Sequence, residues 1–110
     1  MTYSDDDIRS VVTYLRDTLG SDLVGQVGSA DAETIASWAT GTASPSTDVA
    51  VRLRVTAEVV AALSQTSSPS AARAWLTGAH SSLGGQSPVD LLREANVTIA
   101  RSTVLRAARS

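Results

Sequence analysis

Residues 21–45, SDLVGQVGSADAETIASWATGTASP, hold two short helical segments joined by a tight turn, and this layout decides the fold. Ser21 can cap the first segment, and Gly28 is well placed to end it in a left-handed conformation. The apolar residues of this segment recur at helical spacing: Leu23, Val24 and Val27. Ser29 and Ala30 then form the turn.

The second segment begins near Asp31 and places Ile35 and Trp38 on one helix face, three residues apart. Gly41 and Pro45 mark its exit, because glycine permits a left-handed turn and proline cannot continue a helix. Two short helices with a turn between them have the layout of a helix-turn-helix bundle.

Helical spacing continues on both sides of this stretch. Upstream, Ser4 is an N-cap followed by three aspartates, and negative charge is favoured in a first helical turn. That helix runs to Gly20 on this apolar stripe: Ile8, Val11, Val12, Leu15 and Leu19. Downstream, Ser46 or Thr47 starts the longest helix, whose stripe steps by four and three: Val49, Leu53, Thr56, Val60 and Leu63.

Two serine-proline pairs predict the starts of further helices. Ser68 with Pro69, and Ser87 with Pro88, each combine a cap with a proline at the first helical position. We expect the fifth helix to bury Ala72, Trp75 and Leu76, and the sixth to bury Val89, Leu91, Leu92 and Ala95.

The last part of the chain also favours helix. Residues 79–86 read as a flexible loop, Asn96 closes the sixth helix, and residues 97–110 are best explained by a final helix. No segment alternates with period two for long enough to predict a strand, so we expect an all-α fold. We divide it into a helix-turn-helix bundle with a long connecting helix, 1–66, and a C-terminal helical region, 67–110.

The composition limits the size and content of the core. A chain of 110 residues has room for one compact domain, or for two small helical units that share a core. Apolar residues make up 43% of the sequence but include no Phe. The core must therefore be built from small side chains, with Trp38 and Trp75 as its large members.

The sequence offers few candidate residues for catalysis or metal binding. Without Cys the chain has neither disulfides nor thiolate ligands, and no Lys stands at Walker spacing from Gly84 and Gly85 to make them a phosphate site. The one histidine, His80, lies in a polar stretch with no acid nearby in sequence, and the N-terminal aspartates are explained by helix-start electrostatics. We expect a non-enzymatic protein with no cofactor and no metal.

The sequence also bears on where the protein works. No apolar run approaches the roughly 20 residues that a bilayer span requires. The N-terminus opens with acids where a signal peptide carries positive charge. These features predict a cytoplasmic protein without membrane contact.

The charge distribution argues against ordinary DNA reading by the second short helix. Residues 1–51 carry a formal charge of −6 and residues 52–110 carry +4. Between residues 17 and 51 there are five acids and no Arg or Lys, whereas phosphate contacts need cations. Sequence-specific binding would have to use these residues, the last two on phosphates: Gln26, Thr34, Ser37, Thr40, Arg52 and Arg54.

Two motifs resemble a known family. Residues 33–41, ETIASWATG, followed by Pro45, look like the recognition helix and exit of Xre-type helix-turn-helix folds. Residues 74–76, AWL, followed by residues 83–92, LGGQSPVDLL, resemble the toxin-binding region of the Xre/MbcA/ParS-like antitoxins in both order and spacing. The resemblance covers the chain from about Ile8 to Leu105.

The resemblance implies a function and a partner. Antitoxins of this family neutralise toxins of the RES type, which deplete NAD, and their C-terminal helix or tail can obstruct the toxin's active-site cleft. In this chain that role would fall on the final helix, with arginines for acidic groups and two apolar anchors: Arg101, Val104, Leu105, Arg106 and Arg109. Autoregulation of transcription and homo-oligomerisation are further expectations.

Two other functions fit the same residues. In the first, the chain is a DNA-binding repressor or phage-type regulator without a toxin partner, and arginines of the second half contact the phosphates. In the second, helices rich in small residues form an oligomerisation scaffold. The final helix also has a plain structural explanation as a solvated amphipathic helix.

Overall fold

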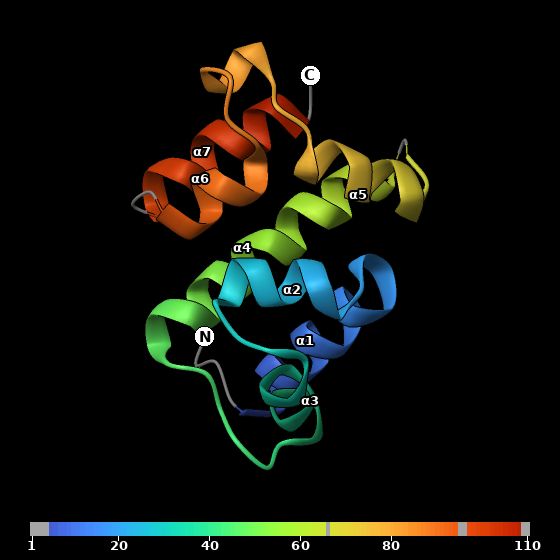
Figure 1. The fold of residues 1–110 in the computed structure, drawn as a ribbon, viewed down its shortest axis with the longest axis vertical. Coiled ribbons are helices and arrows are strands. Elements are labelled where there is room, and N and C mark those ends of the chain that lie inside the picture. Colours follow the sequence, from blue (N-terminus) through green and yellow to red (C-terminus); the bar gives the residue numbers. More distant parts are fainter. Residues whose placement is uncertain (1–4, 66, 95–96, 109–110) are drawn as a thin grey trace.

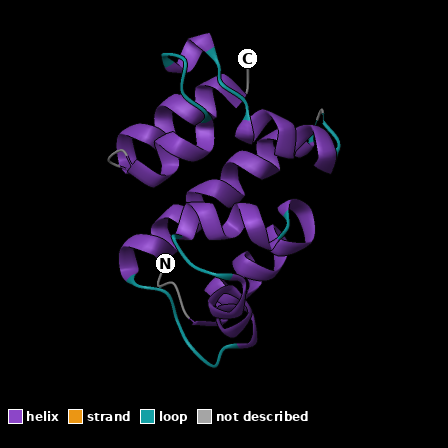
Figure 2. Ribbon diagram, viewed as in Figure 1, coloured by secondary structure: helices purple, strands orange, loops and turns teal. Residues whose placement is uncertain are grey.

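The structure is a computed structural model that describes residues 5–65, 67–94 and 97–108. The all-α prediction is confirmed, since the described residues form helices and loops with no strand (Figure 2). The order along the chain, drawn in Figure 1, is α1 (Asp5–Leu19), α2 (Ser21–Gly28), α3 (Ala32–Thr40), α4 (Thr47–Ser64), α5 (Pro69–Thr77), the short 3-10 helix η1 (Ser81–Leu83), α6 (Pro88–Glu94) and α7 (Val97–Ala108).

Side-chain caps begin several of these helices. The side chains of Asp31, Ser46 and Ser68 each accept a backbone N–H three residues ahead, at the starts of α3, α4 and α5. Pro69 is the first residue of α5, where the missing N–H costs no helical hydrogen bond. Ser21 was expected to be a cap but is the first residue of α2, and Gly20 precedes it with a φ of 91°.

The end of α2 differs from the prediction at Gly28. The left-handed residue is Ser29, with φ 53°, while Gly28 is the last helical residue and is buried. A Cβ on Gly28 would lie 3.2 Å from Cζ3 of Trp38 and 3.5 Å from Cγ1 of Val49. Gly28 is therefore explained by the close approach of α3 and α4 to α2 rather than by the backbone conformation of a helix end.

Helix α4 lies at the centre of the fold. It packs against α1, α2, α5, α6 and α7, and Figure 1 shows it running between α2 and α3 on one side and α5 on the other. Its predicted stripe is buried apart from Val49, which is half-buried. The buried Thr56 hydroxyl donates to the Arg52 carbonyl oxygen at 2.8 Å, so its burial leaves no unmet hydrogen bond.

The core is continuous across the two predicted regions. One connected cluster of buried apolar side chains extends from Ile8 of α1 to Leu105 of α7. Contacts between α2 and α6 and between α1 and α5 also join residues before and after position 66. The molecule measures 39 × 26 × 26 Å, and its two halves share one interior.

The loop expected to be flexible has a defined structure. The His80 backbone accepts hydrogen bonds from the N–H groups of Leu83 and Gly85, and its own N–H donates to the Gln86 carbonyl oxygen. Leu83 is buried. Gly84 and Gly85 have φ of 69° and 82°, and a Cβ on either would meet no neighbour. The positive φ of these two glycines, and not a lack of space for a Cβ, therefore accounts for them.

The final helix is present as expected and is part of the core. α7 packs on α4, α6 and η1, and Val104 is fully buried within it. The predicted stop at Asn96 lies outside the described residues. Among the residues that the structure does describe, no helix combines the length and apolarity that crossing a membrane requires.

Candidate partner-binding surfaces

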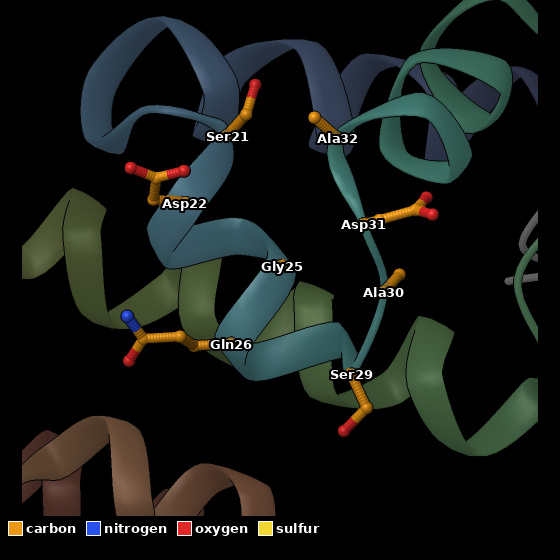
Figure 3. Close-up of a pocket in the computed structure, with 8 residues that line it drawn as sticks. All are labelled: Ser21, Asp22, Gly25, Gln26, Ser29, Ala30, Asp31 and Ala32. Atoms are coloured by element: carbon orange, nitrogen blue, oxygen red, sulfur yellow. The ribbon is translucent and has the colours of Figure 1, made fainter.

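The helix-turn-helix layout is formed by α2, the turn at Ser29 and α3. Figure 3 shows a shallow surface hollow of about 620 Å³ between α2 and the chain that leads into α3. Gly25 and Ala30 lie in it, whereas Asp22 and Gln26 project from α2 away from the turn and Asp31 projects on the opposite side. Because its polar groups diverge, the hollow lacks the convergent polar contacts of a small-molecule site.

Hydroxyl groups on α3 are engaged by the helix itself. The Ser37 hydroxyl donates to the Thr34 carbonyl oxygen at 2.7 Å. The Thr40 hydroxyl lies 3.2 Å from the Ala36 carbonyl oxygen and 2.9 Å from the Thr42 hydroxyl. Base reading needs donors and acceptors that point outward from the helix, so these side chains are poorly set to read DNA.

The first turn of α3 is negative. Asp31 accepts the Thr34 backbone N–H at 2.8 Å, and hydrogen bonding by the side chain and backbone of Thr34 holds the pKa of Asp31 below its ordinary value. Asp31 and Glu33 are both exposed. The N-terminus of a helix by itself favours a bound anion, but the two carboxylates at the N-terminus of α3 repel phosphate.

The other residues considered for DNA contact are dispersed. Gln26 is exposed on α2, and Arg52 and Arg54 are half-buried on α4. Because both arginine side chains are half-buried, neither is as exposed as a phosphate-binding side chain usually is. The structure thus retains the shape of a helix-turn-helix and gives it an acidic outer surface.

Residues 74–92, the second motif of the sequence, form the end of α5, a loop and the start of α6. The His80 ring Nε2 lies 2.8 Å from the Trp75 carbonyl oxygen and must donate to it, because a carbonyl only accepts. The His80 and Trp75 rings are in contact, with centroids 4.9 Å apart and ring planes tilted by 32°. The Ser87 hydroxyl then accepts the Asp90 N–H at the start of α6. Leu76 is fully buried, as predicted, and Trp75 is half-buried.

Helix α7 carries the residues predicted to contact a toxin, and the structure separates them into two groups. Arg101 and Arg106 are exposed, whereas Val104 and Leu105 are buried in the core, with 0% and 5% of their surface accessible. The two apolar residues stabilise the folded chain and are not available as anchors while α7 stays in place. Arg109 lies outside the described residues.

Arg101 has a partner that the sequence analysis did not find. Its Nε donates to Oε1 of Glu58 on α4 at 3.2 Å and to Oε2 at 3.1 Å, and its Nη2 donates to Oε2 at 2.7 Å. The two side chains keep 48% and 44% of their surface exposed, so this bidentate pair is an outer clamp between α4 and α7. No local sequence pattern indicates this pair, because the two residues lie 43 positions apart in sequence.

A second surface hollow, which the sequence did not predict, lies on α1. It has a volume of about 520 Å³ on the outer side of α1 and includes Tyr14, the one large apolar side chain among the described residues that is exposed. Its remaining lining is mostly polar: Arg9, Ser10, Thr13, Asp17 and Ala39. Tyr14 lies off the apolar stripe of α1, and this position in the sequence already indicates that its side chain is exposed.

The described residues contain no group of three or more His, Asp or Glu side chains placed to hold a metal ion. Comparison with known proteins adds no relative, since no family model, curated protein or solved structure matches the chain.

Proposed function

We propose that this chain is an antitoxin-like regulator that binds a cognate RES-type, NAD-depleting toxin and holds it inactive. The resemblance of residues 74–92 to the toxin-binding region of Xre/MbcA/ParS-like antitoxins indicates the class of partner. One observation favours a protein partner over DNA: the outer surface of α2 and α3 presents carboxylates, and the α3 hydroxyls bind the helix's own carbonyl groups.

The outer face of α7 is the contact surface that fits the folded chain. Arg101 and Arg106 are exposed there, while Val104 and Leu105 hold the helix on the core. Guanidinium groups bind carboxylates in a bidentate manner, so the toxin contact would be charged and would leave α7 in place. This differs from an anchor built on the two apolar residues.

Growth rescue tests the proposal directly. The genes next to this one are searched for a RES-type toxin, which is then induced with and without the chain while growth and cellular NAD are measured. We expect the toxin alone to lower NAD and arrest growth, and co-expression to restore both. Continued NAD loss with soluble, folded chain present contradicts the proposal. So does steeply salt-dependent binding to the gene's own promoter DNA without any protection.

Charge variants separate toxin contact from folding. Arg106→Glu reverses an exposed charge, and we expect it to weaken protection while the far-ultraviolet circular dichroism stays unchanged. The paired variant Glu58→Arg with Arg101→Glu keeps the clamp but moves the cation from α7 to α4. If Arg101 contacts the toxin, this folded variant fails to protect. If Arg101 only holds α7, it protects as well as the wild type.

A further inference from the structure

The hollow on the outer side of α1 holds polar groups that the fold leaves without partners. Four of its exposed side chains form neither a hydrogen bond nor an ion pair within the described residues: Ser10, Thr13, Tyr14 and Asp17. The hydroxyls of Ser37 and Thr40 on α3 differ, because they bond to carbonyl groups of their own helix. This face of α1 therefore carries hydrogen-bonding capacity that the chain itself does not use.

The helical repeat makes these groups neighbours. Residues three or four positions apart lie on one helix face, with Cβ atoms about 5–6 Å apart. Tyr14 is related in this way to both Ser10 and Asp17, and Thr13 lies four positions before Asp17. The Tyr14 ring keeps 38% of its surface exposed and lines the same hollow as the carboxylate and the two hydroxyls. An aromatic ring and an unpaired carboxylate thus share one surface.

Arg9 lines the other end of the hollow and is already engaged by the fold. A Cβ on Gly41 would lie 2.9 Å from Cδ and 3.0 Å from Nε of Arg9, so this arginine packs against the C-terminal end of α3. It also has an interaction within the chain. Arg9 and Asp17 are separated by about 12 Å along the helix axis. The charge that the hollow offers to another molecule is therefore the carboxylate of Asp17.

This combination of groups favours a guanidinium as the bound group. Asp17 attracts a cation, and the formal charge of −6 on residues 1–51 adds to that attraction. A guanidinium can stack on an aromatic ring while its N–H groups donate to a carboxylate and to hydroxyls. The hollow is open, so it buries less of a free small molecule than an enclosed pocket does. An arginine carried by a protein gains further contacts at the rim.

We propose that the outer face of α1 is a protein-docking surface, on which an arginine of the partner stacks on Tyr14 and pairs with Asp17. Tyrosine and arginine are the residue types that most often dominate protein interfaces. Figure 1 shows α1 and α7 on opposite sides of α4, so this surface is separate from the toxin contact proposed for α7. Failure of either proposal leaves the other standing.

A peptide titration of the full chain tests the proposal. The probe is acetyl-Ala-Ala-Arg-Ala-Ala-amide, followed by backbone amide chemical shifts at about 50 mM NaCl, where exposed charges are weakly screened. We expect saturating shifts centred on residues 13–17. The same peptide with citrulline for arginine has the same shape without the charge, and it should bind about tenfold more weakly or less. Shifts that are absent from residues 13–17, or equal for both peptides, overturn the proposal.

Variants of the chain assign the contact. Tyr14→Ser removes the ring and Asp17→Asn removes the charge, and each should weaken peptide binding about fivefold or more. Tyr14→Phe keeps the ring and should bind like the wild type. Both side chains are exposed and without partners in the described residues, so an unchanged circular dichroism spectrum is expected of every variant. Undiminished binding by folded Tyr14→Ser overturns the proposal.

Asp22→Asn is the matched control for charge. Asp22 is an exposed acid on α2, and the hollow that it lines contains no aromatic side chain. This variant loses the same charge as Asp17→Asn but keeps the surface on α1, so it should bind the peptide like the wild type. Equal weakening by Asp17→Asn and Asp22→Asn overturns the assigned contact, because it shows that the peptide responds only to the overall negative charge.

Discussion

The carbonyl oxygen of Gly25 accepts the backbone N–H of Ala30 at 3.0 Å, and a Cβ on Gly25 would lie 2.5 Å from the Ala30 carbonyl oxygen. The turn of the helix-turn-helix therefore crosses α2 at a point where only a hydrogen atom fits. The obstacle is backbone, which cannot move aside as a flexible side chain can.

We predict that Gly25→Ala destabilises the protein by about 1–3 kcal/mol, the usual cost of overpacking. This loss must exceed the gain of up to ~1 kcal/mol that alanine brings to a helix interior. Urea unfolding followed by circular dichroism measures it. Gly28→Ala is the control and should cost less, because its nearest neighbour is a Trp38 side-chain atom at 3.2 Å. Equal stability of Gly25→Ala and wild type would show that the turn does not lie on α2.

A second prediction concerns Ser29, which has a left-handed φ of 53°. That conformation costs a non-glycine residue roughly 1–2 kcal/mol, and glycine loses about 0.5–1 kcal/mol more entropy on folding. Ser29→Gly should therefore raise the free energy of unfolding by about 0.5–1 kcal/mol. Gly84→Ala is the mirror experiment in open space, and it should lower that free energy by a similar amount.

The third prediction is a pH dependence at the start of α3. Because the folded pKa of Asp31 is lowered, its contribution is fully present above the ordinary pKa and is lost as the pH falls through the lower folded value. Asp31→Asn keeps a good cap without a titrating group. We expect the wild type to lose stability relative to this variant between about pH 6 and about pH 3, measured by urea unfolding. An unchanged difference would contradict the prediction.

The fourth prediction separates the core residues of α7 from its outer clamp. Leu105→Ala should cost about 2–5 kcal/mol, whereas Arg101→Gln should cost about 1 kcal/mol or less because the pair is exposed. Thermal unfolding of both variants measures the difference. A large loss from Arg101→Gln with a small loss from Leu105→Ala would show that the ion pair, and not the buried apolar residues, holds α7 on the core. Deleting α7 should unfold the chain, so truncation is a poor test of toxin contact.

Local signals in the sequence predicted much of the fold. Caps and prolines act within a few residues, so the starts of α4 and α5 at Ser46 and Ser68 follow from the sequence alone. Gly28 was misassigned because its role depends on Trp38, which reaches it only after α3 packs against α2.

The candidate surfaces were less predictable, because exposure depends on packing between distant helices. Periodicity places Val104 and Leu105 on an apolar face, but such a face serves a core and a partner equally well in sequence. Burial against α4 decides between them. The Glu58–Arg101 pair is equally non-local, and it turns one expected contact residue into part of a clamp.

The shared interior of the two halves has a consequence for cooperativity. Trp38 belongs to the helix-turn-helix and Trp75 to the second half, yet both pack against the same apolar cluster. Their fluorescence should then report one transition with one midpoint, as expected of a single cooperative unit. Any ligand that binds only the native state will slow the global opening reported by amide hydrogen exchange in both halves, wherever it docks.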